Sequence, residues 1–371
     1  MHYAARSIMK NPLILIGVLA ALVGGLYWWH TAEGPTVSPV AGPGGAADEV
    51  SSVLARGLEI PWALAFLPEG DILITERPGR IRLYDSERGL LDEPLLEIAD
   101  VAHRGEGGLL GIVVHPEFPE KPYVYVYYTY QEGQTLANCV VRYALVGESL
   151  RDRQVVLAGI PGANIHNGGR LRFGPDGLLY VTTGDAAVPE LAQQVDSLAG
   201  KILRLADDGS TPRDNPFSGS PVYSLGHRNP QGLAWDDEGR LWATEHGASA
   251  TDEVNLIQPG RNYGWPVIRG DETAAGLEPP VLHSGRDTWA PSGLAYGDGA
   301  LFFAGLRGGS LFEVRLPAVL PVRHLQAEFG RVREVVVGPD GSLYLLTSNR
   351  DGRGSPVADD DRLIRIDRGL L

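Results

Sequence analysis

The sequence predicts an all-β fold, a six-bladed β-propeller. Short apolar strands recur six times, at intervals of roughly 40 to 60 residues, the length of a four-stranded blade with its loops. Several follow turns of one type, LPEG, GPDG, DDEG or YGDG. Glycine (48 residues) and proline (27 residues) are abundant while charged residues make up an ordinary 21%, which favours short strands and tight turns over helices. The six strands span residues 70–76, 123–129, 177–185, 239–245, 300–306 and 341–347.

Other fold classes agree less well with this pattern. The strands of a β-sandwich would follow one another at shorter and less clustered intervals, and a parallel α/β fold would need helical periodicity that the sequence lacks. A closed ring also leaves no unpaired sheet edge. We therefore expect the last strand, RLIRID at 362–367, to pair with the first blade near residues 52–57 and so close the ring.

The first fifty residues are expected to form a separate part of the chain. Arg6 and Lys10 precede an uncharged apolar run that ends in the aromatic residues Tyr27, Trp28 and Trp29. The run is at the short end for a membrane-spanning helix, and its aromatic end suits the membrane interface. We therefore expect a cytoplasmic segment at 1–12, a transmembrane signal-anchor at 13–29, a flexible linker at 30–50 and a propeller domain at 51–371.

A cleaved signal peptide is the alternative interpretation of this segment. The bulky residues that follow the apolar run make a poor cleavage site, so an uncleaved anchor is the better interpretation. Basic residues before the span place the amino terminus in the cytoplasm. We therefore expect the propeller on the periplasmic face of the inner membrane.

Charge and cysteine content exclude several classes of function. A formal net charge of −14 argues against nucleic acid as a partner, because a phosphate backbone requires a basic protein surface. The single cysteine, Cys139, excludes an internal disulfide framework and a cysteine metal cluster.

Polar residues gather in two stretches that lie far apart in the sequence. Residues 223–265 place histidine, arginine and acidic residues between two short apolar runs, and residues 164–170 read NIHNGGR. Propellers bind ligands at the mouth of the central channel, where the loops of the inner strands converge. His166 in the second stretch is the candidate general base, because the ordinary pKa of an imidazole lies close to neutrality.

Four arginines near the ends of predicted strands indicate a binding site for a small polyanion. Arg228 lies in GHRNPQG between turn-forming residues, and Arg307 follows the fifth recurring strand. Arg331 and Arg333 alternate in GRVREV, so both side chains of an extended strand would face one way. Guanidinium groups bind carboxylates and phosphates in a bidentate manner. The alternative is that these arginines are solvated surface residues, an interpretation that suits Arg331 and Arg333 better than Arg228.

The acidic stretch 245–253 indicates a calcium site. Its carboxylates and the backbone around Gly247 offer oxygen ligands, which calcium accepts in irregular geometry, whereas zinc requires several histidines or cysteines. The sequence contains no EF-hand loop. A turn whose acidic side chains face the solvent is the alternative.

Residues 51 to 371 resemble the glucose/sorbosone dehydrogenase family, in its branch of aldose sugar dehydrogenases that use pyrroloquinoline quinone. The resemblance implies a six-bladed propeller, a calcium-held quinone on the channel axis and oxidation of an aldose at its anomeric carbon to a lactone. It is carried, in order, by GEGGLLGIVVHPEF (105–118), IHNGGRLRFGPDGLLYVTTGD (165–185), GKILRLADDGSTPRDNPF (200–217), LGHRNPQGLAW (225–235), EHGASATDEVNLIQPGRNYGWP (245–266) and GRVREVVVGPDGSLYLLT (330–347).

The resemblance also assigns roles to individual residues. His166 matches the catalytic base, and Arg228, the second catalytic residue, matches a position that stabilises negative charge on the quinone oxygen. Further cofactor-binding positions of the family match Asn229, Arg307, Arg331 and Arg333. The backbone carbonyls of Gly247 and Ala248 match the ligands of the catalytic calcium, and those of Glu253 and Tyr263 match the ligands of a second calcium.

Three positions depart from the family pattern. Glu106 occupies a cofactor-binding position where a glutamine is usual, so that a carboxylate lies near an anionic cofactor unless it is protonated or paired. Ile165 replaces an aspartate that precedes the catalytic histidine, and Ser348 replaces a cofactor-contacting aspartate. These departures concern the affinity for the cofactor and the choice of sugar rather than the chemistry.

Two other functions are compatible with a propeller. A calcium-dependent lactonase or esterase would hold its metal with acidic and amide side chains from several blades, and a neutral lactone has no use for clustered arginines. A non-catalytic binding propeller would lack the histidine or the arginines. An aldose dehydrogenase also needs an electron acceptor, here expected to be a membrane quinone or a cytochrome.

Removal of residues 1–50 is expected to release a soluble and active enzyme, because the apolar run at 13–29 would be the attachment to the membrane. Cell fractionation should find the full-length chain in the membrane pellet and the shortened chain in the supernatant. A native chain that is recovered already shortened in the soluble periplasmic fraction would instead indicate cleavage of a signal peptide.

Overall fold

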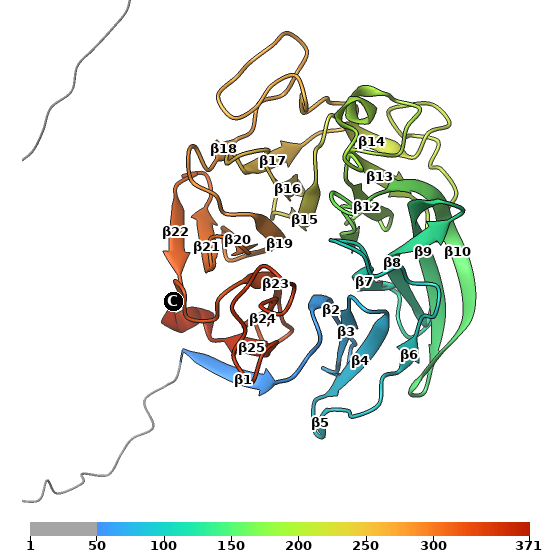
Figure 1. Ribbon diagram of the computed structural model, residues 1–371, viewed down its shortest axis with the longest axis vertical. Coiled ribbons are helices and arrows are strands. Elements are labelled where there is room, and N and C mark those ends of the chain that lie inside the picture. The colour runs from blue at the N-terminus through green and yellow to red at the C-terminus, as the bar shows by residue number, and fades with distance from the viewer. Residues whose placement is uncertain (1–49) are drawn as a thin grey trace, which may run out of the picture. The chain divides into compact units, whose positions relative to one another are not determined.

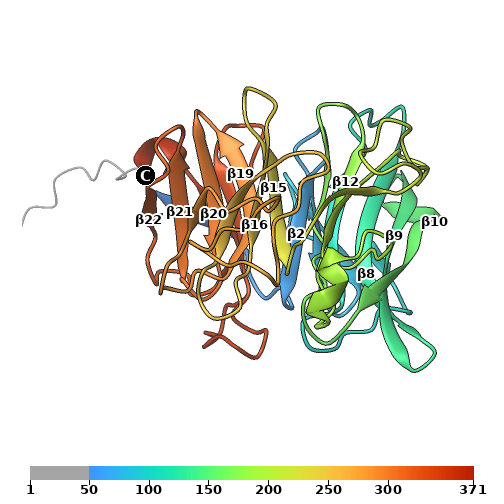
Figure 2. The same ribbon diagram turned by 90° about the horizontal axis from the view of Figure 1, so that it is seen from above.

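The computed structural model describes residues 50–371, which form six antiparallel β-sheets around a central axis (Figure 1). Seen from the side, the inner strands run along this axis (Figure 2). The prediction of a six-bladed propeller is therefore confirmed. No helix within residues 50–371 has the length and apolar character that crossing a membrane requires. The predicted anchor and nearly all of the predicted linker lie outside the described residues, so both stay predictions.

The first three blades follow one another in chain order. Blade 1 contains β2 (Pro61–Phe66), β3 (Ile72–Glu76), β4 (Arg80–Asp85), β5 (Gly89–Leu90) and β6 (Leu96–Glu97). Blade 2 contains β7 (Leu109–Val114), β8 (Tyr123–Glu132), β9 (Thr135–Val146) and β10 (Ser149–Gly162). Blade 3 contains β11 (Leu171–Phe173), β12 (Leu179–Thr183), β13 (Lys201–Leu205) and β14 (Val222–Leu225), with a short 3-10 helix η1 (Pro189–Gln193).

The remaining three blades complete the ring. Blade 4 contains β15 (Pro230–Trp235), β16 (Leu241–Glu245), β17 (Glu253–Ile257) and β18 (Leu282–His283). Blade 5 contains β19 (Pro291–Gly297), β20 (Ala300–Gly305), β21 (Ser310–Arg315) and β22 (Pro321–His324). Blade 6 contains β23 (Val332–Val337), β24 (Leu343–Thr347), β25 (Leu363–Ile366) and β1 (Ser51–Ala55), and η2 (Arg368–Leu370) follows it.

The six strands that the sequence predicted are all confirmed, and each is the second strand of its blade. The turns before five of them share a backbone conformation. Their final glycines have φ between +72° and +97°, a left-handed region that favours glycine over any residue with a Cβ atom. The recurring glycine therefore marks the turn from the first to the second strand, and that turn lies on one face of the ring. The five glycines are Gly70, Gly177, Gly239, Gly299 and Gly341.

The ring is closed by pairing between the two ends of the described chain. β1 is the outermost strand of blade 6 and runs antiparallel to β25, with Ser51 opposite Ile366. The predicted pairing between residues 362–367 and the segment near 52–57 is thus confirmed. The assignment of that segment to the first blade is wrong, because Ala55 is followed by a crossing to β2, the innermost strand of blade 1.

The apolar core of the propeller lies between neighbouring blades. Strands such as β3, β16 and β20 are buried along their whole length, because the sheets pack against neighbouring blades on both faces. Separate clusters of buried side chains join blade 3 to blade 4, blade 4 to blade 5, blade 5 to blade 6 and blade 6 to blade 1, and a larger cluster joins blades 1, 2 and 3. This continuous packing fixes the positions of the inner strands from which the loops of the site emerge.

A buried ion pair crosses the central channel. Arg170, just before β11 of blade 3, contacts Glu334 of β23 in blade 6, and both side chains are fully buried. Blades 3 and 6 lie opposite each other in the ring (Figure 1). The Arg170 guanidinium also donates from Nε to the carbonyl of Gln231 at 2.7 Å and lies 4.4 Å above the ring of Trp62. Four blades therefore meet at this one side chain.

Loss of one member of this pair should be costly. Arg170→Met would leave the buried Glu334 carboxylate with only the more distant Arg172, at 3.9 Å, and we expect the free energy of unfolding to fall by about 3–5 kcal/mol. The double variant Arg170→Met/Glu334→Leu should recover much of this loss because no buried charge remains. Urea unfolding of the described domain measures both. A matched control is Arg365→Met, which breaks the partly exposed pair Arg365–Asp340 and should cost less than about 1 kcal/mol. An Arg170→Met domain as stable as the unmutated one would contradict this account.

Candidate active site

A cavity of about 680 Å³ opens on the face of the ring opposite the glycine turns. Its walls come from loops of blades 2 to 6, as expected where inner strands end. The structure brings together most of the predicted site residues here. Those that line the cavity are Glu106, His166, Arg228, Gly247, Ala248, Arg307 and Arg331. Asn229 and Arg333 are buried, and Glu253 and Tyr263 line a smaller neighbouring cavity.

His166 is held by a buried carboxylate. Its Nδ1 lies 2.7 Å from Oδ1 of Asp185, a residue that follows β12 and whose side chain is fully buried. The histidine backbone has φ +59°, which turns the side chain out of the strand direction and toward the cavity. A neutral imidazole that donates from Nδ1 to Asp185 keeps Nε2 free to accept a proton. This is the arrangement that a general base requires.

Asp185 connects the histidine to Arg228 and Trp265. Its Oδ2 accepts a hydrogen bond from Nε1 of Trp265 at 2.8 Å, and its backbone N–H donates to the carbonyl of Arg228 at 2.8 Å. Sequence analysis did not identify Asp185 as a site residue. A carboxylate directly after a recurring strand, in TTGD at 182–185, was the available indication.

Arg228 points into the cavity with part of its donor capacity unused. Nη1 donates to the carbonyl of His246 at 3.3 Å, and the guanidinium lies 5.3 Å from the ring centre of Trp265. Its Nε is buried and has no hydrogen-bond partner among residues 50–371. Burial lowers the pKa of Arg228, and the nearby Asp185 and Glu245 partly offset this effect. The side chain is thus a fixed positive group that faces the cavity.

Arg333 lies beneath the cavity and is also incompletely satisfied. Nη1 donates to Gln231 Oε1 at 2.8 Å and to Ser292 Oγ at 3.2 Å, whereas no group in the described chain accepts from Nε. Burial lowers the pKa of Arg333 to about 9, against the attraction of Asp351. Such a destabilised buried charge is typical of a binding site whose anionic ligand completes it. Asn229 beside it accepts from Gly168 N–H at 3.0 Å, and its Nδ2 reaches no acceptor within residues 50–371.

Arg331 is fixed by an acidic residue that sequence analysis missed. Its Nη2 and Nε donate to Asp351 Oδ2 at 2.8 and 3.2 Å, and Asp351 is almost fully buried. Ser348, which stands where the family has an aspartate, has a buried hydroxyl without a partner in the described structure. The carboxylate that accompanies this arginine therefore comes from a position three residues farther along the chain.

Glu106 is both paired and ionised. Oε1 accepts from Nη1 of Arg353 at 2.7 Å, and Oε2 accepts from the backbone N–H of His166 at 3.0 Å. Burial opposes ionisation of this carboxyl, but the hydrogen bonds from His166 and Arg353 outweigh it and lower its pKa to about 2. The carboxylate is therefore neutralised by Arg353 and positions the loop of the candidate base, which makes it compatible with a nearby anionic cofactor.

The loop 246–252 offers free carbonyl groups at the cavity wall. Asp252 fixes this loop because its Oδ1 accepts from Gly247 N–H at 2.8 Å and its Oδ2 accepts from Trp289 and Ala290 N–H at 2.7 and 2.8 Å. No donor in residues 50–371 reaches the carbonyl oxygens of Gly247 or Ala248. Within the described chain no group of three or more His, Cys, Asp or Glu side chains is placed to hold a metal. A cation at this wall would therefore depend on backbone oxygens.

The smaller cavity next to this loop is lined by two glutamates, Glu245 and Glu253, and by two arginines, Arg228 and Arg269. Glu253 and Tyr263 line it together with Gly247 and Ala248. Burial, followed by repulsion from Glu245, raises the pKa of Glu253 to about 8. A positive ion in this space would relieve that repulsion.

A second histidine forms a buried hydrogen-bonded chain. Ser224 Oγ lies 2.8 Å from His227 Nε2, and His227 Nδ1 lies 2.8 Å from Glu245 Oε2. This order of groups occurs in serine hydrolases, but here Ser224 and His227 are fully buried and His227 stacks on Tyr263. No substrate can reach the serine. Glu245 also accepts from the backbone N–H of Arg228, so the chain serves to fix that arginine.

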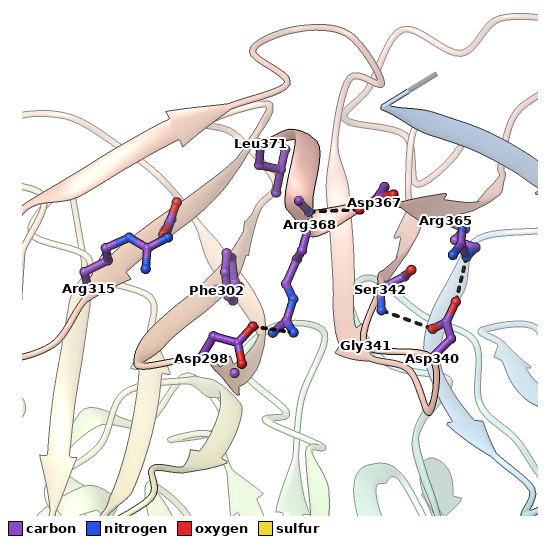
Figure 3. Close-up of a pocket in the computed structure, with 13 residues that line it drawn as sticks. Asp298, Phe302, Arg315, Asp340, Gly341, Ser342, Arg365, Asp367, Arg368 and Leu371 are labelled. Atoms are coloured by element: carbon purple, nitrogen blue, oxygen red, sulfur yellow. Dashed lines mark hydrogen bonds and ion pairs between the residues drawn. The ribbon is translucent and has the colours of Figure 1, made fainter. Parts of the chain in front are cut away.

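A separate cavity of about 370 Å³ lies between blades 5 and 6, beside the C-terminus (Figure 3). Its arginines pair with neighbouring acids, as in Arg368–Asp298 at 2.7 Å and Arg365–Asp340 at 2.8 Å. It holds no histidine, and its acidic residues outnumber its arginines. We therefore place the candidate site at the channel mouth.

Comparison with known proteins agrees with this geometry. A family model described as glucose/sorbosone dehydrogenase matches residues 58–365. The aldose sugar dehydrogenase YliI of Escherichia coli K12 is 35% identical over 336 residues, 81% of this chain and 90% of that protein. The quinoprotein glucose dehydrogenase B of Acinetobacter calcoaceticus is 35% identical over 257 residues, 60% of this chain and 54% of its own length. The solved structure of a PQQ-bound aldose sugar dehydrogenase from Streptomyces coelicolor has a TM-score of 0.81 and 43% identity, and the match covers 85% of this chain and 97% of that one. The chain belongs to the glucose/sorbosone dehydrogenase family.

Proposed function

We propose that this protein is an aldose dehydrogenase that oxidises sugars at the anomeric carbon to lactones, with pyrroloquinoline quinone as its cofactor. The observation that carries the proposal is the His166–Asp185 pair at the wall of an arginine-lined cavity. A general base serves to take a proton from a hydroxyl, and the arginines serve an anionic acceptor. The family membership supports the same reaction.

The residues of the cavity fit this cofactor. Its volume of about 680 Å³ lies within the range of ligand sites, roughly 300 to 1,000 Å³. Arg228 and Arg333 each have a buried Nε that no group within residues 50–371 satisfies. We infer that these two arginines, with Arg331, Arg307 and Asn229, bind the carboxylates and carbonyl oxygens of the quinone. When bound, the quinone supplies the acceptor for the hydride and its electron pair.

We also infer a calcium ion at this site. The free carbonyls of Gly247 and Ala248 support it, since calcium accepts backbone oxygens in irregular geometry. Glu253 and Tyr263, which share a small cavity with them, are the corresponding candidates for a second calcium. The catalytic ion would act as a Lewis acid that polarises the cofactor.

The chain's own residues account for the proton transfer. His166 Nε2 would accept the proton of the anomeric hydroxyl, and Asp185 stabilises the imidazolium that results through the 2.7 Å contact at Nδ1. Trp265 and the Ala187 backbone N–H hold Asp185 in turn, at 2.8 Å each. Arg228 contributes positive charge where negative charge develops in the reaction. The buried surroundings of Asp185 strengthen each of these interactions.

Neither alternative function agrees as well with the site. A calcium-dependent lactonase or esterase would need several metal-ligating side chains, and residues 50–371 show no such group. A non-catalytic binding propeller would have no use for a histidine hydrogen-bonded to a buried aspartate and exposed to a charged cavity.

The cellular setting is also a proposal. We infer that residues 13–29 anchor the propeller at the periplasmic face of the inner membrane, supported by the basic residues, apolar run and aromatic end of that segment. Electrons would then pass from the reduced cofactor to a membrane quinone or a cytochrome.

Replacement of His166 should lower turnover without loss of cofactor binding or stability. We choose His166→Asn because asparagine tolerates a positive φ. Removal of a general base typically lowers kcat by about a hundred- to ten-thousandfold. Quinone titration and thermal unfolding should remain close to those of the unmutated protein.

His283 is the matched control. Its ring, like that of His166, contacts a carboxylate, with Nε2 2.8 Å from Asp271, but it does not line the cavity. His283→Asn should leave kcat unchanged. If His283→Asn lowers turnover as much as His166→Asn, the assignment of the base is wrong.

Cofactor binding should depend on calcium, on Arg331 at the cavity wall and on the buried Arg333. Chelation should give an inactive protein that calcium with quinone restores, and magnesium should restore it poorly because it demands tighter octahedral geometry. Arg331→Met or Arg333→Met should each weaken quinone binding by about 1.5–3 kcal/mol, the size of a lost charge-assisted hydrogen bond. Fluorescence titration of the apoprotein measures this. Unchanged titrations for both variants would remove these arginines from the site.

A further inference from the structure

One wall of the active-site cavity carries four donor groups, of which only Arg307 has a role in the reaction proposed above. Arg286 and Thr288 lie in the loop between β18 and β19, Arg307 follows β20, and Ser249 follows β16. All four line the cavity. Within residues 50–371, neither guanidinium makes a hydrogen bond or ion pair, and neither hydroxyl group has a hydrogen-bond partner. Blades 4 and 5 thus present unpaired donors at the cavity mouth.

Of the other cavity arginines, Arg228 donates to the carbonyl of His246, and the remaining two form ion pairs. Arg353 is paired with Glu106 at 2.7 Å, and Arg331 is paired with Asp351 at 2.8 Å. The carboxylate of Asp252 accepts three backbone N–H groups and faces none of the arginines in an ion pair. Arg286 and Arg307 are therefore the two cavity guanidiniums without any partner in the described chain, in a protein whose formal net charge is −14.

The proposed cofactor accounts for only part of this positive wall. The family resemblance assigns Arg307 to the quinone, and it assigns nothing to Arg286 or Thr288. Both of these side chains come from a loop that reaches the exposed edge of the cavity, where Arg286 is solvent-accessible. Exposed guanidinium groups at the edge of a site attract and orient anionic groups of an incoming ligand.

We propose that Arg286, with Thr288 of the same loop, binds an anionic group of the sugar, so that the preferred substrates are aldoses that carry a carboxylate or a phosphate remote from the anomeric carbon. This inference rests on the proposed function. The reaction itself is unchanged. The anomeric hydroxyl proton passes to His166, the anomeric hydrogen leaves as hydride with its electron pair to the quinone, a lactone forms, and the anionic group does not react.

The test uses the full chain loaded with quinone and calcium, with reduction of an artificial dye as the readout. The substrates are glucose, glucuronate and glucose 6-phosphate. We expect kcat/KM for one or both anionic sugars to exceed that for glucose by about tenfold or more at low ionic strength, and the difference to shrink as salt screens the arginines. A preference for glucuronate alone would identify the carboxylate, and one for glucose 6-phosphate alone the phosphate.

The variant Arg286→Gln should lower the ratio of anionic to neutral kcat/KM by roughly ten- to a hundredfold, mainly through KM. Arg213→Gln is the matched control, because Arg213 is exposed, has no hydrogen bond or ion pair within residues 50–371 and does not line the cavity. It should leave the ratio unchanged. Quinone titration of Arg286→Gln should match that of the unmutated protein.

The outcomes separate this inference from the proposed function. If glucose is oxidised and neither anionic sugar is preferred, the anion subsite is wrong and the dehydrogenase function stands. If Arg286→Gln weakens quinone binding as Arg333→Met does, Arg286 belongs to the cofactor site and the subsite is equally overturned. If the loaded protein oxidises no sugar at all, the proposed function fails first.

Discussion

The contact between Arg170 and Glu334 is the constraint on which the rest of the structure depends. Six sheets around an axis leave a channel, and a channel needs groups that fill it without leaving polar atoms unpaired. Here two opposite blades meet in a fully buried ion pair, which also uses the carbonyl of Gln231 and the ring face of Trp62. The ion pair joins blades 3 and 6 across the channel, and neither of its two side chains lines the active-site cavity.

The Arg170–Glu334 ion pair and the proposed cofactor-binding region have two neighbouring residues in common, Gln231 and Trp62. Gln231 accepts from Arg170 through its backbone carbonyl and from Arg333 through its side chain, and Trp62 lies under both guanidinium groups, at 4.4 and 5.7 Å. Arg333 is thereby fixed from below while its Nε stays unsatisfied among the described residues. The arginines therefore have three different roles. Arg170 is structural, Arg333 is proposed to bind the cofactor, and Arg286 is exposed to the solvent.

Local sequence patterns predicted the strands well but not the partners of the site residues. The second strand of every blade was predictable because apolar runs and glycine turns are local features. His166 and the arginines were also recognisable from local features, because they lie in glycine-rich stretches or near the ends of predicted strands. Asp185 and Arg353 did not, since Asp185 is recognisable only once β12 brings it to His166, and Arg353 lies 247 residues from Glu106. The pairing of residues 52–57 with the last strand was predicted correctly, but their blade was not, because the crossing from Ala55 to the innermost strand of blade 1 has no local sequence signal.

The position of β1 in blade 6 has a consequence for how the protein is made. β1 leaves the ribosome first among the strands, yet its partner β25 is almost the last segment to be synthesised. Blades 1 to 5 can each form from neighbouring segments, but the sixth must wait until both chain ends are on the same side of any membrane. An exported chain of this topology cannot lock its ring while part of it is still in transit. Closure of the ring is therefore the last step of folding in a chain of this topology.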